Sequence, residues 1–216
     1  MQKRTKERQI LKLAVFDFDS TLMDGETIEF LAAEQGIQEQ VKEITDRAMR
    51  GELDFFESLT TRVELLKGMN VSKVNEICQN LPLMNGAKEI IAELKKQGYK
   101  VICLSGGFKN ATVPLCNKIG IDADFSNILH EKNGLLTGMV GGEMMFNSSK
   151  GEIIQRVQKL LDVTYENTLV AGDGANDLSM FKYAAKRVAF CAKPILEKEA
   201  NIIIKEKDLR LILDEI

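Results

Sequence analysis

Two aspartates, Asp17 and Asp19, stand at the start of the heptapeptide 17–23 (Asp-Phe-Asp-Ser-Thr-Leu-Met), directly after the apolar run 13–16. That run predicts a buried parallel strand, and open α/β sheets bind ligands at the carboxyl ends of their strands. Residues i and i+2 face the same side of an extended segment, so both carboxylates can address one site. Neighbouring carboxylates repel each other unless a cation or a shared proton holds them. The pattern therefore predicts an all-oxygen site suited to Mg²⁺.

A second motif near the other end of the chain has the same design. The apolar run 168–172 is followed by Asp173-Gly174-Ala175-Asn176-Asp177. Glycine lets the backbone turn sharply and approach a ligand closely. Asp173 and Asp177 are too far apart to share one strand face, so we expect the turn to bring them together.

Two further segments carry groups suited to phosphate. The predicted strand 100–104 is followed by Ser105-Gly106-Gly107, which offers a hydroxyl and flexible backbone donors. Lys150 opens an amphipathic helix, where an ammonium group can hold a phosphate as a point charge.

Taken in order, these four motifs resemble those of the haloacid dehalogenase superfamily of phosphotransferases. Within it, the chain is similar to the phosphoserine phosphatase family from about residue 11 onward, through the segments 23–28, 48–51, 55–62, 105–108 and 190–194. The resemblance implies an α/β fold, a Rossmann-like parallel sheet core with an inserted helical cap. We expect the core at residues 1–22 and 84–216 and the cap at 23–83.

The resemblance also implies a reaction, the Mg²⁺-dependent hydrolysis of O-phospho-L-serine at the end of the phosphorylated route to serine. Asp17 would attack phosphorus and form an aspartyl-phosphate. Asp19 would protonate the leaving serine oxygen and then take a proton from the attacking water. The metal would be held by Asp17, the backbone carbonyl of Asp19, and Asp173.

Further roles follow from the same resemblance. Ser105, the Gly106 backbone N–H and Lys150 would bind the remaining phosphate oxygens. Asn176 is expected near the phosphate, and Asp177 would orient Lys150 or a metal-bound water.

Substrate choice is expected to rest on the cap. The resemblance places Glu26 on the substrate ammonium group and Arg62 on its carboxylate, which a guanidinium fork matches well. Met49 and Phe55 would exclude water when the cap closes.

Periodicity supplies the elements that position these groups. Strands are expected at 13–18, 100–104, 123–129, 168–172, 187–190 and 201–204, mostly separated by helices, which favours a parallel sheet with right-handed crossovers. Four helices are expected in the insert, at 27–35, 38–50, 54–67 and 72–80. Residues 134–146 resemble an antiparallel hairpin with glycine turns. Pro114 is expected to mark a late helix start or a kink.

Composition limits the other classes of function. The 216-residue chain carries a net charge of −3, which argues against a general nucleic-acid binder. The short basic run at 3–8 is expected to be a solvated arm, and the four cysteines to be free thiols. No apolar run reaches the roughly 18 residues of a membrane span. We expect a cytoplasmic monomer or homodimer whose partner is a small molecule.

Three alternatives remain open at this point. One is another small-metabolite phosphatase with the same core, and a second is a phosphotransferase that passes the phosphoryl group to an alcohol or sugar. The third is a signalling receiver module, which also uses Asp, Mg²⁺, a hydroxyl and Lys but has no need for the acid at Asp19 or for a helical insert.

Overall fold

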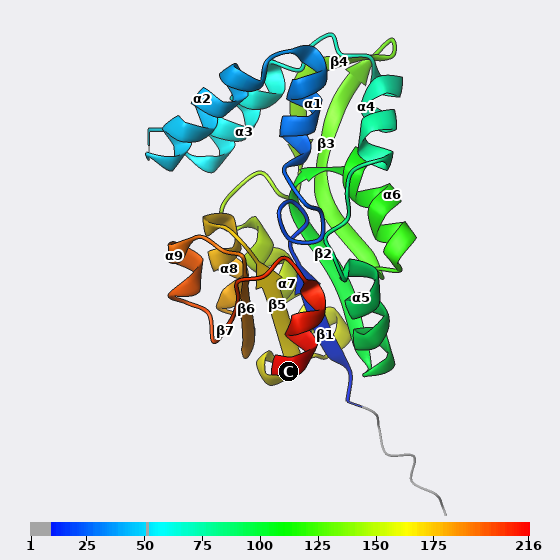
Figure 1. The fold of residues 1–216 in the computed structure, drawn as a ribbon, viewed down its shortest axis with the longest axis vertical. Coiled ribbons are helices and arrows are strands. Elements are labelled where there is room, and N and C mark those ends of the chain that lie inside the picture. The colour runs from blue at the N-terminus through cyan, green and yellow to red at the C-terminus, as the bar shows by residue number, and fades with distance from the viewer. Residues whose placement is uncertain (1–9, 51) are drawn as a thin grey trace, which may run out of the picture.

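A computed structural model describes residues 10–50 and 52–216 of the chain (Figure 1). The basic run at 3–8 therefore lies outside the described residues. No helix in the described ranges combines the length and apolar character needed to cross a membrane.

One seven-stranded sheet forms the centre of the molecule, in the order β4-β3-β2-β1-β5-β6-β7. Its members are β1 (Lys12–Phe16), β2 (Tyr99–Phe108), β3 (Ala123–Lys132), β4 (Leu135–Gly142), β5 (Thr168–Gly172), β6 (Lys186–Phe190) and β7 (Ile202–Ile204). All neighbours pair in parallel except β3 and β4. This arrangement confirms the predicted α/β fold class and places β1 and β5 side by side at the centre.

The central strand β1 is buried on both faces because its side chains alternate between two cores. Ala14 and Phe16 belong to one apolar cluster, while Leu13 and Val15 belong to the other. The first cluster is covered by α5 (Ala87–Lys96), α6 (Lys109–Ile119) and η3 (Leu209–Glu215), the second by α7 (Ser149–Leu161), α8 (Leu178–Phe181) and α9 (Pro194–Glu197). Burial on both sides explains why β1 is a continuous apolar run.

Four helices lie between β1 and β2 in the sequence: α1 (Thr27–Gln35), α2 (Gln38–Met49), α3 (Phe55–Glu64) and α4 (Val71–Gln79). Helix α3 begins with a capping box, in which Asp54 accepts from the Glu57 N–H and Glu57 accepts from the Asp54 N–H. In Figure 1, α2 and α3 lie on the same side of the sheet centre as α8 and α9, with a space between the two pairs.

The structure differs from the sequence-based prediction at three places. Strand β2 runs on to Phe108 through an irregularity after Leu104, so the Ser-Gly-Gly segment belongs to the strand instead of following it. Residues 134–146 hold one strand, β4, and the antiparallel hairpin is formed by β3 and β4 around Asn133 and Gly134, both with positive φ. Helix α6 begins at Lys109 with Pro114 inside it, so the proline does not mark a helix start.

Candidate active site

Two aspartates are brought together by the pairing of β1 with β5. Asp17 follows β1 and its backbone N–H donates to the carbonyl of Ala171 at 2.9 Å, while Asp173 follows β5 directly. Both side chains line one cavity of about 940 Å³ between the inserted helices and the sheet. The parallel register thus turns a separation of more than 150 residues in sequence into one site.

Lys150, in the first turn of α7, bridges two of the carboxylates. Its Nζ donates to Asp17 Oδ1 at 2.6 Å and to Asp177 Oδ1 at 2.5 Å, and all three side chains are buried. Burial alone lowers the pKa of Lys150, but the two carboxylates outweigh it and raise the pKa above its ordinary value. Lys150 is therefore held charged.

Asp177 is fully engaged by protein groups. Its Oδ2 accepts the backbone N–H of Asp173 and of Gly174, each at 3.0 Å, while its Oδ1 accepts from Lys150. It is 0% exposed and does not line the cavity. Asp177 therefore bonds both to the turn after β5 and to Lys150.

Three neighbouring aspartates provide negative charge and oxygen ligands that suit a divalent cation. Asp17, Asp173 and Asp177 each place one carboxylate oxygen within 4.8 Å of the others. Burial and the nearby Asp177 raise the pKa of Asp17 well above its ordinary value and that of Asp173 to about 6. Lys150 offsets only one of the three negative charges. Of these carboxylates, Asp17 and Asp173 face the cavity and have oxygens available for a metal.

Asp19 is turned toward the first inserted helix. Its Oδ1 accepts from the Thr27 backbone N–H at 2.7 Å and from Thr27 Oγ1 at 2.6 Å. Its Oδ2 accepts from Ser105 Oγ at 3.4 Å, and Ser105 Oγ in turn accepts from the Gly107 N–H at 2.8 Å. Burial raises the pKa of Asp19, and the two Thr27 hydrogen bonds oppose that shift. A Cβ on Gly107 would approach Oδ2 to 2.7 Å, so glycine keeps this oxygen accessible.

Glu26 and Arg62 place a carboxyl group and a guanidinium farther along the cavity wall. Ser20 has positive φ and donates from Oγ to Glu26 Oε1 at 2.7 Å. Burial, together with the negative Asp19, raises the pKa of Glu26 to about 8. Burial lowers the pKa of Arg62, which forms no ion pair within 4.0 Å among the described residues. The cavity therefore contains a carboxyl group and a guanidinium that do not form an ion pair with each other.

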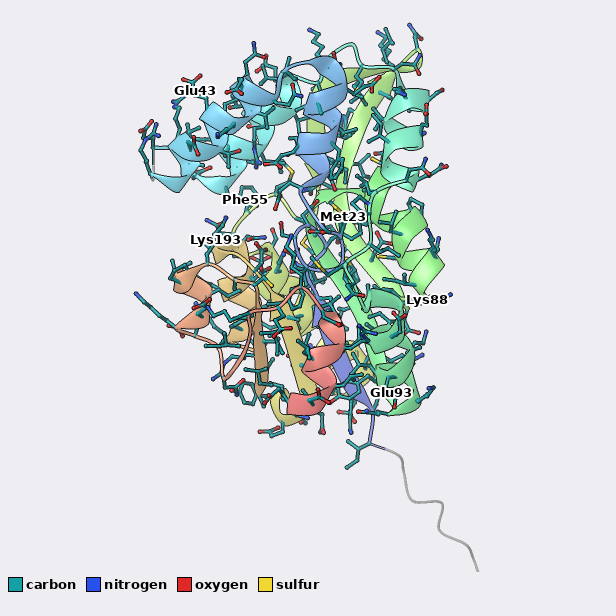
Figure 2. All side chains as sticks on the ribbon, viewed as in Figure 1. Met23, Glu43, Phe55, Lys88, Glu93 and Lys193 are labelled. Carbon is teal, nitrogen blue, oxygen red and sulfur yellow. The ribbon has the colours of Figure 1, made fainter. Side chains whose placement is uncertain are left out.

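Helix α3 contacts the core loops through two adjacent phenylalanines. A Cβ on Gly106 would approach the Phe55 ring to 2.8 Å, so glycine is needed for this close packing. Phe56 stacks on Phe146, with ring centroids 5.5 Å apart and planes 12° apart. Figure 2 shows Phe55 on the helical side and Lys193 on the core side, and both line the cavity. The inserted helices are thus seated on the core in this structure.

The structure gathers most of the predicted site residues around one cavity. Its lining includes Asp17, Asp19, Glu26, Phe55, Arg62, Gly106, Asp173 and Asn176, whereas Ser105, Lys150 and Asp177 are buried just behind it. The prediction for Met49 concerns a side chain outside the described part of the structure. Sequence reasoning gave no role to Thr27 and Lys193, which also line the cavity. The available signal for Thr27 was a hydroxyl residue at the start of a predicted helix. Such a residue usually caps the helix by accepting a backbone N–H, whereas Thr27 donates its hydroxyl to Asp19.

Comparison with known proteins agrees with this arrangement. Residues 11–185 match the haloacid dehalogenase-like hydrolases. The phosphoserine phosphatase of Wolinella succinogenes is 64% identical over 94% of this chain and 98% of its own length. A solved phospho-aspartyl intermediate analogue of phosphoserine phosphatase is 47% identical, with a TM-score of 0.92 over 96% of this chain and 100% of that one. A substrate-bound phosphoserine phosphatase complex, also 47% identical, has a TM-score of 0.91 over 95% and 98% of the two chains. The chain belongs to the haloacid dehalogenase-like hydrolases and, among them, to the phosphoserine phosphatase family.

Proposed function

We propose that the chain hydrolyses O-phospho-L-serine to L-serine and phosphate, with Mg²⁺ as its metal, as the last step of the phosphorylated route to serine. One observation carries this proposal. The cavity that holds the Asp17, Asp19 and Asp173 carboxylates is also lined by Glu26 and Arg62. The reacting groups therefore share a single space with a carboxyl group and a guanidinium, which suit the ammonium and carboxylate groups of an amino acid.

Asp17 is proposed as the nucleophile. In the first step its carboxylate oxygen attacks phosphorus, the P–O bond to serine breaks, and an aspartyl-phosphate forms. The ion pair with Lys150 at 2.6 Å supports this role, because it favours the ionised carboxylate that burial disfavours. In the second step water attacks phosphorus, which releases phosphate and restores Asp17.

Asp19 is proposed as the acid and base. A serine alkoxide is a poor leaving group, so a proton must reach the leaving oxygen as the bond breaks. Burial raises the pKa of Asp19 and so favours the protonated acid at the start of the cycle. After donating its proton, the Asp19 carboxylate can take one from the attacking water.

Asp17, Asp173 and the Asp19 backbone carbonyl are proposed to hold the Mg²⁺. Two carboxylates that face the cavity, in a group whose negative charge exceeds that of Lys150, form a donor set of the kind that Mg²⁺ prefers. When bound, the ion would offset the negative charge on the phosphate and stabilise the charge that develops during transfer.

The remaining phosphate oxygens are proposed to bind Ser105, the Gly106 N–H and Lys150, with Asn176 nearby. Ser105 and Lys150 already lie against Asp19 and Asp17, respectively. Donors fixed in this way need little reorganisation when charge develops on the phosphoryl group.

Substrate recognition is proposed to rest on Glu26 for the ammonium group and on Arg62 for the carboxylate. A guanidinium group stays charged in proteins and matches a carboxylate with two parallel hydrogen bonds. An incoming ammonium group would stabilise the ionised form of Glu26, whose pKa burial raises to about 8 in the free chain. Phe55, packed on Gly106, would exclude water, and the same role is proposed for Met49.

Residues 23–83 are proposed to act as a cap that opens and closes over a core made of 1–22 and 84–216. The insert begins directly after the Asp17–Asp19 segment, and its only described stacked aromatic contact with the core is the exposed pair Phe56 and Phe146. The insert also packs on the core elsewhere, through α3 on β4 and through α4 on α6. The exposed stack is the contact that can break and re-form during a catalytic cycle.

Phosphate release from a panel of monoesters tests the proposal. The panel contains O-phospho-L-serine, O-phospho-L-threonine, phosphoethanolamine and a sugar phosphate, with Asp17→Asn as the inactive control. We expect the highest kcat/KM for O-phospho-L-serine, with serine and phosphate formed in equal amounts. A higher value for another ester would reassign the substrate, and a new ester in place of free phosphate would identify a phosphotransferase.

A further inference from the structure

Thr27 makes the closest contacts to the proposed acid and base. Its backbone N–H and its hydroxyl both donate to a single oxygen, Oδ1 of Asp19, at 2.7 and 2.6 Å. Thr27 is 1% exposed, so both donors lie in a buried setting. Two short hydrogen bonds to one carboxylate oxygen hold that oxygen in a single place.

The same contacts complete the first turn of α1. Thr27 is the first residue of α1, so its N–H has no partner within the helix, and the residue before it, Glu26, makes no side-chain capping bond. The Asp19 carboxylate takes the place of a cap, and a negative group is favourable at a helix N-terminus. The acid and base is thereby attached to the first helix of the insert.

The two oxygens of Asp19 are consequently not equivalent. Thr27 occupies Oδ1, whereas Oδ2 is directed toward Ser105 Oγ at 3.4 Å, beside the space that Gly107 leaves open. A protonated carboxyl with its hydrogen on Oδ2 still offers Oδ1 as an acceptor. Both Thr27 bonds can therefore persist while Oδ2 gains and loses a proton.

We propose that Thr27 is a positioning residue, which holds Oδ1 of Asp19 so that Oδ2 is the oxygen that transfers the proton. In the first step the proton passes from Oδ2 to the serine oxygen as its bond to phosphorus breaks. In the second, Oδ2 receives a proton from the water that attacks the aspartyl-phosphate. This inference rests on the proposed function and adds to it a residue that acts through Asp19.

The hydroxyl of Thr27 can be removed with little change of shape. Thr27→Val keeps the branched side chain and the backbone N–H but loses the Oγ1 bond, while Thr27→Ser keeps the hydroxyl. Thr27→Ala is a second hydroxyl-free variant if valine at this position does not fold. Thr112→Val is the matched control, because Thr112 is another buried threonine whose hydroxyl bonds a carboxylate, Asp124, at 2.8 Å in a separate part of the fold.

The test compares leaving groups in a rapid-quench experiment that follows the first turnover only. O-phospho-L-serine needs a proton on its leaving oxygen, and acetyl phosphate does not, because acetate is a stable anion. Thr27→Val should slow serine release by about ten- to hundredfold, since it loses one charge-assisted hydrogen bond that fixes a reacting group. For Thr27→Val, the rate of acetate release and the KM for O-phospho-L-serine should stay near those of the wild-type chain. All rates of Thr27→Ser and Thr112→Val should also stay near the wild-type values.

Equal slowing with both substrates would overturn the proposal, because a structural defect affects both. Serine release by Thr27→Val or Thr27→Ala at the wild-type rate would also overturn it. Failure of the proposed function has a different signature, in which the wild-type chain itself releases no serine from O-phospho-L-serine.

Discussion

Removing one ring of the Phe56–Phe146 stack should weaken the proposed closure of the cap over the core. The two rings come from α3 and from the loop before α7, with centroids 5.5 Å apart and planes 12° apart. A stacked aromatic pair contributes about 0.5–1.5 kcal/mol beyond the area that it buries. Because Phe56 is 40% and Phe146 60% exposed, water still contacts the outer faces of both rings. We therefore expect the lower part of that range, about 0.5–1 kcal/mol.

This energy favours the closed arrangement, so its loss should appear in substrate affinity. It corresponds to a factor of about 2–5 in the ratio of closed to open molecules. The measurement is the dissociation constant of O-phospho-L-serine in an Asp17→Asn background, where turnover does not interfere. Phe56→Ala and Phe146→Ala should each raise the dissociation constant by about that factor, and the double variant by little more than either one. Leu160→Ala is the control, because Leu160 is an 82% exposed apolar residue of α7.

A double-variant cycle separates the stack from general effects of losing an aromatic side chain. If the two single effects simply add, the rings do not act as a pair and the cap is held by other contacts. The chain contains no tryptophan, so Phe146→Trp introduces a single tryptophan at the contact, whose emission can be excited apart from that of the three tyrosines. Its emission should change when O-phospho-L-serine binds, and an unchanged spectrum at saturation would argue against movement of α3 relative to this loop.

Four further results are expected. Asp17→Asn should abolish phosphate release while the thermal unfolding curve keeps its shape, and its turnover at the wild-type rate would exclude the covalent route. Asp19→Asn should lower kcat by about 10²–10⁴-fold because the proposed acid is lost. Exhaustive chelation should remove activity and added Mg²⁺ should restore it, as checked by metal analysis of the chelated protein. The pKa of Glu26 is about 8 in the folded chain against an ordinary 4.5, so its contribution to stability is complete below pH 4.5 and is lost as pH rises through 8. Above pH 8, Glu26→Gln should therefore be more stable than wild type by roughly 1–3 kcal/mol, measured by urea unfolding of the metal-free protein. No difference would mean that Glu26 is well solvated. Arg62→Ala should lower kcat/KM far more for O-phospho-L-serine than for phosphoethanolamine, which lacks the carboxylate, by up to about 10³-fold, and equal losses would assign Arg62 to the fold of the insert.

The elements of the fold were largely accessible from sequence because local patterns determine them. Strand β1 is buried on both faces and is therefore an apolar run, and its position before Asp17 places that residue at the sheet edge. The glycines after β5 likewise indicate a turn that can bring Asp173 and Asp177 together. In both cases the relevant information lies within a few residues of the side chain concerned.

Other features depend on tertiary contacts that local patterns do not encode. Strand β2 continues past an irregularity and pairs with β3 again at Phe108, and Gly106 within this extension packs against Phe55 from the insert. The Phe56–Phe146 stack joins residues about ninety positions apart, and either phenylalanine alone resembles an ordinary core residue. Thr27 and Asp19 are near in sequence, yet their contact requires the positive φ of Ser20, which a non-glycine residue rarely adopts.

The hydrogen bonds of the loop after β1 connect the proposed acid, Asp19, to Glu26, the residue proposed to bind the substrate ammonium group. Asp19 is bonded to Thr27, and Ser20 is bonded to Glu26, so two successive residues of the loop after β1 are tied to two successive residues at the start of α1. A rotation of α1 that moved Glu26 relative to the core would also strain the bonds that orient Asp19. The ammonium group of a correct substrate, by holding Glu26 in place, would thus favour the orientation of Asp19 that proton transfer requires. A substrate without that group would lose rate as well as affinity, because part of its binding energy would no longer be used to hold the acid in place.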